Sequence, residues 1–124
     1  MSTIVQELTP KDFDGVRLRS GECCAVVFFH PSCGHCKEFL PIFRKVAARC
    51  GFLDFASFNC EVHSEALSRM SADAKGFKIT GFPTTIFFSG GKPSESVVGK
   101  RNEGDFLGEC MRVAEALACR KRKR

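Results

Sequence analysis

Tryptophan and tyrosine are both missing from this chain, and all 13 of its aromatic residues are phenylalanine. Phenylalanine rings bring no hydroxyl or indole N–H group that needs a buried partner, so the aromatic content indicates core packing and carries no functional signal. With 124 residues and 44% hydrophobic content, the chain is long enough for one compact domain and too short for two. We therefore predict a single hydrophobic core.

Long hydrophobic runs are missing as well. The longest, Cys23 to Phe29, has seven residues, against the roughly 20 that a membrane-spanning helix needs. The start of the chain, Met1 to Glu7, lacks the basic beginning and apolar stretch of a secretory signal, and the chain does not end in a retention tetrapeptide. We therefore expect no membrane partner and a cytoplasmic or nuclear location.

Charge of one sign is in excess only at the C-terminus. The formal net charge of +5 equals the charge of the last five residues, Arg120 to Arg124, and the rest of the chain has 14 basic and 14 acidic residues. We predict a domain over residues 1–118 and a disordered basic tail over 119–124. Nucleic acid is expected to bind weakly at most, and only through this tail, which is either a solvated end or a nuclear-targeting or polyanion-binding segment.

Hydrophobic periodicity predicts an alternation of strands and helices. The apolar run from Cys24 to Phe29 is typical of a strand that is buried on both faces of a sheet. We expect strands over residues 4–8, 24–29, 53–59, 84–88 and 94–99, and helices over 9–21, from after 31 to 50, over 64–75, and over a last segment that includes 106–117. This order predicts an α/β fold in which a mixed central sheet is flanked by helices on both faces.

Eight cysteines are many for a reducing compartment, which does not normally sustain a disulfide framework. Cys33 and Cys36 stand where the buried strand gives way to a helix, and their three-residue offset brings the two Cα atoms within disulfide range. At a helix start, backbone N–H groups and the helix dipole stabilise the Cys33 thiolate, and a protonated His35 acts in the same direction. Such stabilisation favours the dithiol over the disulfide and so predicts an oxidising redox pair.

The segment from Phe28 to Lys37, FFHPSCGHCK, resembles the active-site segment of the thioredoxin superfamily, and the Gly34-His35 dipeptide is the version found in protein disulfide isomerases. Gly81-Phe82-Pro83-Thr84 resembles the second signature of the family, in which the proline is cis and faces the redox pair. Gly99-Lys100-Arg101 resembles the loop from which isomerase domains bring an arginine toward the buried cysteine. The resemblance extends from residue 4 to about residue 117 and implies a thioredoxin fold.

The resemblance also implies an activity and roles for single residues. Cys33 is the exposed nucleophile and Cys36 the recessed cysteine that resolves the mixed disulfide, with Gly34, His35 and Arg101 as further catalytic residues. Phe82 and Pro83 would bind a client peptide as an added strand. The implied protein is a monomeric isomerase that forms or rearranges disulfides in proteins with cysteines, with no metal and no cofactor beyond its own dithiol. Single-domain proteins of this pattern are known among large DNA viruses that assemble in the cytosol.

The chain departs from the isomerase pattern at three positions. Isomerase domains have Trp before the first cysteine, and a buried Glu and a nearby Lys that move protons for the recessed cysteine. Here these positions hold Ser32, Val27 and Ser57. Because both charged groups are replaced, neither is left buried without its partner.

Two other functions stay open from the sequence. One is a reductase that works like thioredoxin; the other is a non-enzymatic module that binds polyanions or a metal, for which further zinc ligands would have to come from Cys23, Cys24, His30 or His63. Arg101 could also be a plain surface charge. Cys50, Cys60 and Cys110 are predicted as small core residues, whereas Cys119 is interpreted either as a bystander thiol or as a site of intermolecular bonds.

Overall fold

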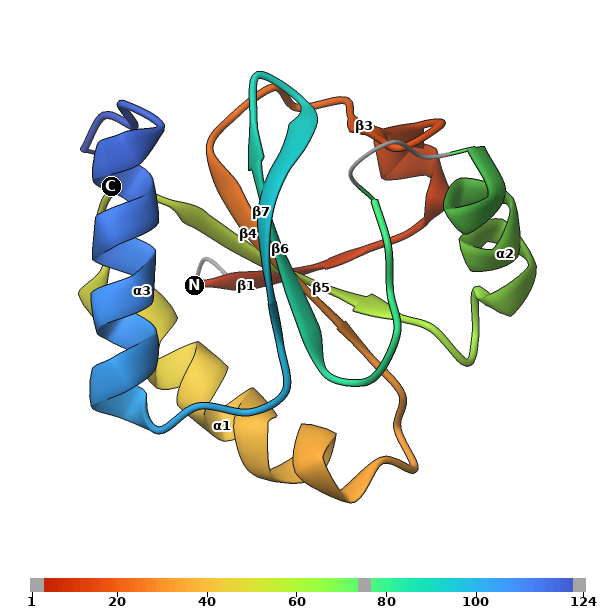
Figure 1. Cartoon of the computed structure of the whole chain (residues 1–124), viewed down its shortest axis with the longest axis horizontal. Helices are drawn as coiled ribbons and strands as arrows, with labels where there is room; N and C mark the ends of the chain where they lie inside the picture. The colour runs from red at the N-terminus through yellow and green to blue at the C-terminus, as the bar shows by residue number, and fades with distance from the viewer. Residues whose placement is uncertain (1–3, 74–76, 122–124) are drawn as a thin grey trace.

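The computed structural model describes residues 4–73 and 77–121, and its centre is a sheet in the strand order β1-β5-β4-β6-β7 (Figure 1). The bounds of these strands are β1 Val5–Leu8, β4 Cys24–Phe29, β5 Asp54–Asn59, β6 Thr84–Ser89 and β7 Lys92–Val98. β1, β5 and β4 are parallel, whereas the β4/β6 and β6/β7 pairs are antiparallel. The predicted mixed sheet is confirmed.

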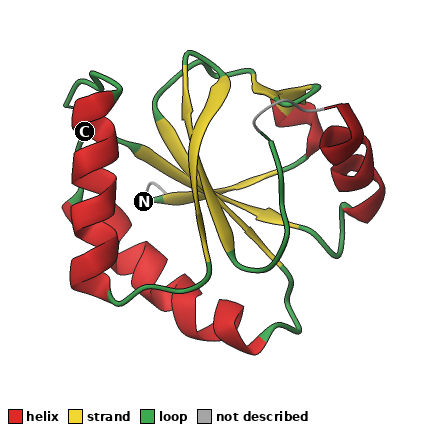
Figure 2. Cartoon of the chain, viewed as in Figure 1, coloured by secondary structure: helices red, strands yellow, loops and turns green. Residues whose placement is uncertain are grey.

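β4 lies at the middle of the sheet and is buried on both faces, as its sequence predicts. Since successive side chains of a strand point to opposite faces, Ala25 and Val27 belong to one hydrophobic cluster, and Val26 and Phe28 to the other. Helices α1 (Gly34–Arg49) and α3 (Glu103–Ala116) supply the first cluster, and α2 (Ser64–Asp73) supplies part of the second. Helices therefore cover both faces, as Figure 2 shows.

Phenylalanine fills both clusters. Between α1 and α3, the rings of Phe39 and Phe106 meet edge to face at 4.9 Å between centroids. On the opposite face, the rings of Phe28 and Phe77 meet in the same way at 5.3 Å. Edge-to-face contacts of this kind add stability beyond the area that the rings bury. The absence of Trp and Tyr is thus matched by a core without polar aromatic groups.

The helix expected over residues 9–21 is wrong. Thr9 does cap a helical turn, because its hydroxyl accepts from the Lys11 N–H at 3.2 Å and the Asp12 carboxylate accepts from the Thr9 N–H at 2.8 Å. The turn is only the 3-10 helix η1 (Pro10–Asp12), and a small hairpin of β2 (Phe13–Asp14) and β3 (Arg17–Leu18) follows it. Gly15 makes the hairpin turn at φ +62°.

The hairpin forms because it buries more than a helix would. Phe13 and Leu18 are register partners, are 5% and 3% exposed, and belong to the cluster that includes Phe28. In a helix over the same segment, Phe13 and Leu18 would be five positions apart and would point in directions about 140° apart around the helix axis. One face of that helix could not bring both side chains to the sheet. The other elements agree with prediction, except that β7 begins at residue 92 instead of 94 and that residues 74 and 75 of the third helix lie outside the described residues.

The turn between β6 and β7 requires glycine at residue 91. Gly91 has φ +85°, and a Cβ built on it would lie 2.8 Å from the carbonyl oxygen of Leu18. The Gly91 carbonyl in turn accepts a hydrogen bond from the Leu18 N–H at 2.8 Å. The close approach of these two backbones connects the small hairpin to the edge of the main sheet.

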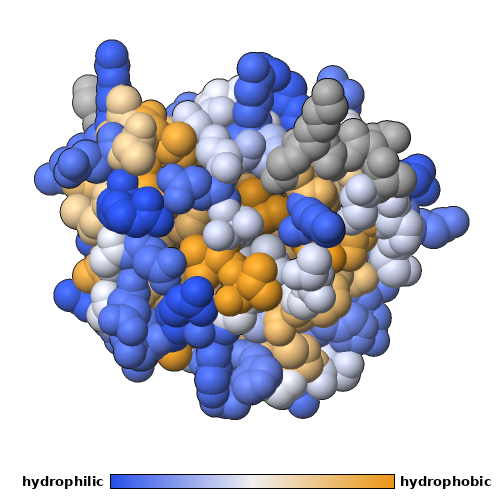
Figure 3. Space-filling model, in the orientation of Figure 1, coloured by the Kyte–Doolittle hydropathy of each residue, from blue (hydrophilic) through white to orange (hydrophobic). Residues whose placement is uncertain are grey.

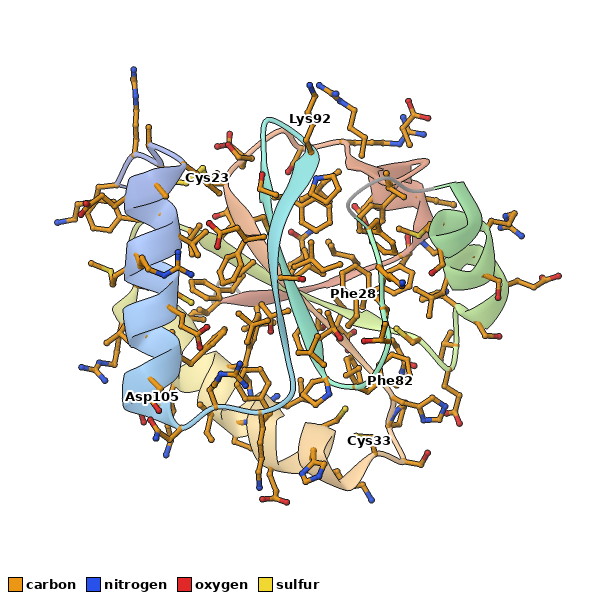
Figure 4. The ribbon with its side chains drawn as sticks, viewed as in Figure 1. Cys23, Phe28, Cys33, Phe82, Lys92 and Asp105 are labelled. Atoms are coloured by element: carbon orange, nitrogen blue, oxygen red, sulfur yellow. A yellow bond between two sulfur atoms is a disulfide. The ribbon has the colours of Figure 1, made fainter. Side chains whose placement is uncertain are left out.

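A disulfide joins Cys23, directly before β4, to Cys119, just after α3, with the two Cα atoms 6.0 Å apart. Both interpretations of Cys119, a bystander thiol and a site of intermolecular bonds, are therefore wrong for this structure. The fold creates the pair, because α3 returns along the sheet and ends beside the start of β4 (Figure 4). The prediction for the other helix and strand cysteines is confirmed, since Cys50, Cys60 and Cys110 are 1%, 4% and 0% exposed.

The face of the molecule drawn in Figure 3 is mostly hydrophilic, with separate hydrophobic areas between the hydrophilic side chains. Across the described residues, no helix is long and apolar enough to span a membrane. Residues 122–124 of the basic tail lie outside the described part of the chain.

We predict that Cys23→Ser lowers the free energy of unfolding by about 2 to 4 kcal/mol, because a cross-link between residues so far apart restricts the unfolded chain. Urea unfolding followed by circular dichroism measures the change. In a Cys33→Ser/Cys36→Ser background, which removes the other redox pair, dithiothreitol should lower the midpoint, and it should leave the midpoint unchanged once Cys23→Ser is added. Equal midpoints of this background with and without dithiothreitol would contradict a stabilising disulfide.

Candidate active site

Cys33 occupies the N-cap position of α1. Its backbone is extended (φ −80°, ψ 122°), and its Sγ accepts a hydrogen bond from the Cys36 N–H at 3.3 Å. The Cys33 N–H donates to the carbonyl of His30 at 3.0 Å, which closes the turn between β4 and α1. A helix start carries unpaired N–H groups and a partial positive charge, so the position favours an anion. The sulfur thus takes the place of a capping oxygen.

These contacts lower the pKa of the Cys33 thiol. The largest effect is the hydrogen bond with the Cys36 side chain. Burial is second and raises the pKa, and the backbone N–H groups of Cys36 and His35 each lower it by less than burial raises it. Burial, and then the hydrogen bond with Cys33, raises the pKa of Cys36 to about 11. Cys36 is only 1% exposed. The two thiols are therefore chemically different: one is ready to act as a nucleophile and the other is recessed and protonated.

Gly34 and His35, between the two cysteines, both lie at the surface. A Cβ built on Gly34 would meet nothing within 4 Å, so packing does not require glycine there. The side chain of His35 contributes to a lowered pKa of Glu38, after the larger effect of Lys100, whose Nζ lies 2.6 Å from the Glu38 carboxylate. His35 acts on Cys33 through its backbone N–H in this structure.

The loop before β6 places Phe82 and Pro83 at the redox pair. The Cys33 thiol donates to the carbonyl oxygen of Phe82 at 3.6 Å, and the Phe82–Pro83 peptide bond is cis. Pro83 is buried, and its carbonyl accepts from the Gly99 N–H at 2.7 Å. Figure 4 shows Phe82 and Cys33 at the same end of the molecule. The two motifs, about 50 residues apart in the sequence, thus form one site.

Arg101 makes contacts with α3 and with its own loop. Its guanidinium lies 3.1 Å from the carboxylate of Glu109 on α3 and donates to the carbonyls of Val98 and Lys100 at 3.2 and 3.1 Å. Within the described part of the chain, no contact joins it to Cys36. These contacts match the alternative interpretation, a surface charge, and a role of Arg101 in catalysis stays a prediction.

Val27 and Ser57 are register partners on neighbouring strands β4 and β5, so their side chains share one face of the sheet. Val27 is 0% exposed and belongs to the cluster that includes Phe39 of α1, and Ser57 is 8% exposed. The two residues are therefore neighbours, whereas their match to the acid and the base of isomerase domains stays a prediction.

Three polar side chains near Cys33 were not identified from the sequence as one group. The hydroxyl of Ser32 lies 2.8 Å from Nδ1 of His30, and Nε2 of His30 lies 4.0 Å from the Glu61 carboxylate. The His30 ring also faces the Phe82 ring, with centroids 6.0 Å apart. In the sequence, only the closeness of His30 and Ser32 to Cys33 could have suggested this group. Glu61 follows the end of β5 and is far from Cys33 in the sequence.

Cys60 is a third thiol near the pair. Its N–H donates to the Phe29 carbonyl at 2.8 Å, which places it beside the end of β4. Burial raises the pKa of Cys60 to about 12, and the charge of Cys36 adds to the shift. Such a thiol stays protonated and unreactive at neutral pH. The described residues hold no group of three side chains that could bind a metal ion.

Comparison with known families agrees with this geometry. The sequence model of the family described as thioredoxin matches residues 4–112. The chain belongs to the thioredoxin family. Among solved structures, the thioredoxin Mala s 13 of Malassezia sympodialis has a TM-score of 0.67 and 19% identity, covering 89% of this chain and 90% of that one. The thioredoxin fold predicted from the sequence is thereby confirmed.

Curated relatives of this thioredoxin-family chain are protein disulfide isomerases. The isomerase erp38 of Neurospora crassa is 33% identical over 120 residues, which cover 97% of this chain and 31% of the relative. MPD1 of Saccharomyces cerevisiae is 36% identical over 85 residues, which cover 68% of this chain and 25% of the relative. The chain therefore spans about a third or less of the length of these relatives.

We predict that iodoacetamide modifies Cys33 at least about ten times faster than Cys36 at pH 7, because only the thiolate reacts. As the pH rises, the Cys33 rate should reach half its maximum below the pKa of an ordinary cysteine, whereas Cys36 should do so near pH 11. Mass spectrometry of the alkylated peptides gives both rates. Equal rates at pH 7 would remove the case for an activated Cys33.

We predict that Val27→Glu lowers the free energy of unfolding by about 3 kcal/mol, because it buries an unpaired carboxyl group in the central strand. Adding Ser57→Lys should restore part of this loss, since the two side chains lie on the same face of neighbouring strands. Urea unfolding of the four variants measures the coupling.

The matched control for this cycle is Val26→Glu. Val26 is equally buried, but its side chain belongs to the cluster on the opposite face of β4. Its loss should be additive with that of Ser57→Lys. Coupling of Ser57→Lys with Val26→Glu but not with Val27→Glu would show that the faces are assigned wrongly.

Proposed function

We propose that the chain is a thiol–disulfide oxidoreductase of the protein disulfide isomerase type, acting on cysteines of other proteins. The observation that carries the proposal is the difference between the two thiols of the pair. Cys33 is accessible, caps α1 and has a lowered pKa, whereas Cys36 is buried behind it with a raised pKa. A nucleophile and a recessed resolving thiol, three residues apart, are what disulfide exchange needs.

The reaction follows from these two positions. With the pair oxidised, a client thiolate attacks Cys33 Sγ, the Cys33–Cys36 bond breaks, and Cys36 leaves as a thiolate that takes up a proton. A second client thiolate then attacks the client sulfur of the mixed disulfide, and Cys33 leaves as a thiolate that its N-cap hydrogen bonds stabilise. Two electrons pass from the client to the pair. In the reverse direction, Cys33 attacks a client disulfide and Cys36 releases it.

Isomerisation uses the same mixed disulfide without consuming the pair. Cys33 opens a client disulfide, the released client thiolate attacks elsewhere in the client, and Cys33 leaves again. This path does not need Cys36 to lose its proton. Val27 and Ser57 supply neither an acid nor a base to help with that proton, so the mixed disulfide is expected to live longer than in isomerases that carry both charges.

Client binding is proposed at the backbone of Phe82. Its carbonyl oxygen lies 3.6 Å from Cys33 Sγ, so an extended client strand whose cysteine reaches Cys33 could donate an N–H to it. The glycine at residue 34 leaves the approach to Cys33 without a side chain above it. Recognition through backbone groups reads little of the client sequence, so a broad range of client proteins is inferred.

The Gly34-His35 dipeptide and the isomerase relatives favour this function over a thioredoxin-like reductase. Reported potentials are about −180 mV for protein disulfide isomerase and about −270 mV for thioredoxin. We expect the potential of the Cys33–Cys36 pair, measured at equilibrium with glutathione, to lie near the first value. His35→Pro should lower it by about 30 mV or more, a tenfold change in the equilibrium constant. A potential near the thioredoxin value would favour the reductase instead.

We predict that Cys36→Ser makes mixed disulfides with client proteins accumulate, whereas Cys33→Ser abolishes them, because only Cys33 forms the first bond. Reduced and scrambled ribonuclease can serve as the client, with non-reducing gels and mass spectrometry as the measurement. Cys110→Ser, which removes a fully buried thiol, is the matched control and should behave like the wild type. Equal trapping by both active-site variants would show that the assigned roles are wrong.

A further inference from the structure

The chain holds two cysteine pairs in different redox states. Cys23 and Cys119 are joined by a disulfide, whereas Cys33 and Cys36 are both thiols. The pairs lie at opposite ends of β4, since Cys23 directly precedes the strand and the loop to Cys33 follows it. Six residues of strand separate them by about 20 Å, and Figure 4 shows Cys23 and Cys33 at opposite ends of the molecule. Exchange between the two pairs therefore requires two copies of the chain.

The Cys23–Cys119 pair lies at the surface, although both side chains also pack against the core cluster that includes Phe39 and Phe106. Both cysteines are only half-buried and line one surface cavity of about 330 Å³, together with Glu22, Ser89 and Lys121. The cysteines of the core differ in this respect, since Cys60 and Cys110 are 4% and 0% exposed and burial raises the pKa of each thiol. Of these four cysteines outside the active site, only Cys23 and Cys119 are therefore exposed enough to react when they are reduced.

Cys119 lies in a short turn directly after α3. Ala118, directly before it, has φ +55°, a left-handed conformation that residues other than glycine seldom adopt. The N–H groups of Ala118 and Cys119 hold the turn by donating to the carbonyls of Glu115 at 3.1 Å and Ala114 at 2.9 Å, and the bond to Cys23 adds to these contacts.

We propose that a second copy of this chain is a client: the oxidised Cys33–Cys36 pair of one copy forms the Cys23–Cys119 disulfide of another. The proposal rests on the proposed function and names a substrate of that same site. The exchange ends with Cys23 bonded to Cys119 and with Cys33 and Cys36 reduced. The lowered pKa of Cys33 and the 6.0 Å separation of Cys23 and Cys119 favour those products.

The exchange has two steps, and Cys119 is the first to react. Arg120 and Lys121 follow it, and cationic neighbours favour a thiolate. The Cys119 thiolate of the client copy attacks Cys33 Sγ, the Cys33–Cys36 bond breaks, and Cys36 leaves and is protonated. The Cys23 thiolate then attacks Cys119 Sγ and Cys33 leaves as a thiolate. Two electrons move from the client copy to the catalytic copy; one of the two client protons goes to Cys36 and the other to solvent.

The test measures the transfer of a disulfide between two copies of the chain that differ in mass. The donor is the wild-type chain labelled with ¹⁵N and fully oxidised; the recipient is unlabelled Cys33→Ser/Cys36→Ser, reduced with dithiothreitol and desalted. After mixing at equal concentrations, free thiols are alkylated and counted on each copy by mass spectrometry. We expect the recipient to lose two thiols and the donor to gain two, at least tenfold faster than with the same concentration of oxidised glutathione.

Variants of the recipient locate the reacting thiols. Adding Cys119→Ser should abolish the transfer, whereas adding Cys110→Ser, the matched control, should leave it unchanged. A donor with Cys36→Ser, reduced and at tenfold excess, should capture a mixed disulfide between its Cys33 and Cys119 of a recipient whose Cys23–Cys119 bond is intact. This second measurement begins from the folded, oxidised recipient, so it decides the question even if the reduced recipient unfolds.

A dithiol peptide unrelated to this chain serves as a second client. It distinguishes failure of the proposed function from failure of the inference that a second copy is a client. If the donor oxidises the peptide while the recipient keeps its thiols and no mixed disulfide forms, the second copy is not a client and the proposed function stands. If the donor oxidises neither, the proposed function fails and this inference fails with it. Transfer that persists in the Cys119→Ser recipient would also overturn the assignment of the reacting pair.

Discussion

The hydrogen bond from the Cys36 N–H to the sulfur of Cys33 is the contact on which the site depends. It makes a thiol the N-cap of α1, where backbone N–H groups and the helix dipole stabilise a negative charge. The position of Cys33 is fixed because the strand before it, β4, is the most buried part of the sheet. Its residues Val26, Val27 and Phe28 are all inaccessible to solvent. A rigid strand and a helix start thus position a reactive sulfur at the surface.

Packing on both faces of the sheet stabilises the junction between β4 and α1. Phe39 of α1 packs against Phe106 of α3, which fixes the helix whose first turn holds the pair. Phe28 packs against Phe77 on the other face. The loop that carries Phe82 comes from the strand antiparallel to β4, so its carbonyl reaches Cys33 across the sheet end. The phenylalanine core and the reactive site are therefore parts of one packing arrangement.

The opposite end of β4 has its own chemistry. There the disulfide between Cys23 and Cys119 connects the start of the central strand with the end of the last helix. One strand therefore separates a half-buried disulfide at one end from the Cys33–Cys36 pair at the other. This arrangement connects the many cysteines of the chain with its proposed activity, whereas Cys60 and Cys110 belong to the core.

The sequence by itself determined the five strands of a mixed sheet, three of the four helices predicted, and the place of Cys33 and Cys36, because these depend on local periodicity and on a motif within ten residues. It did not determine the order of the strands in the sheet. It also indicated the hairpin of β6 and β7 from the Gly90-Gly91 turn. The first helix was predicted wrongly, although Asp14-Gly15 is a turn signal. Its capping box was real, but the burial of Phe13 and Leu18 against the sheet outweighed continued helix formation.

Only the tertiary structure decided which distant residues meet. The bond between Cys23 and Cys119 spans 96 positions, the Phe82 carbonyl meets a sulfur 49 positions away, and Arg101 pairs with Glu109 on α3. The family resemblance had placed Phe82 near the pair, but no local pattern could place the other two. Such pairs depend on how helices and strands pack after they form, and packing is decided by the whole core, whereas periodicity reports only on the residues nearby.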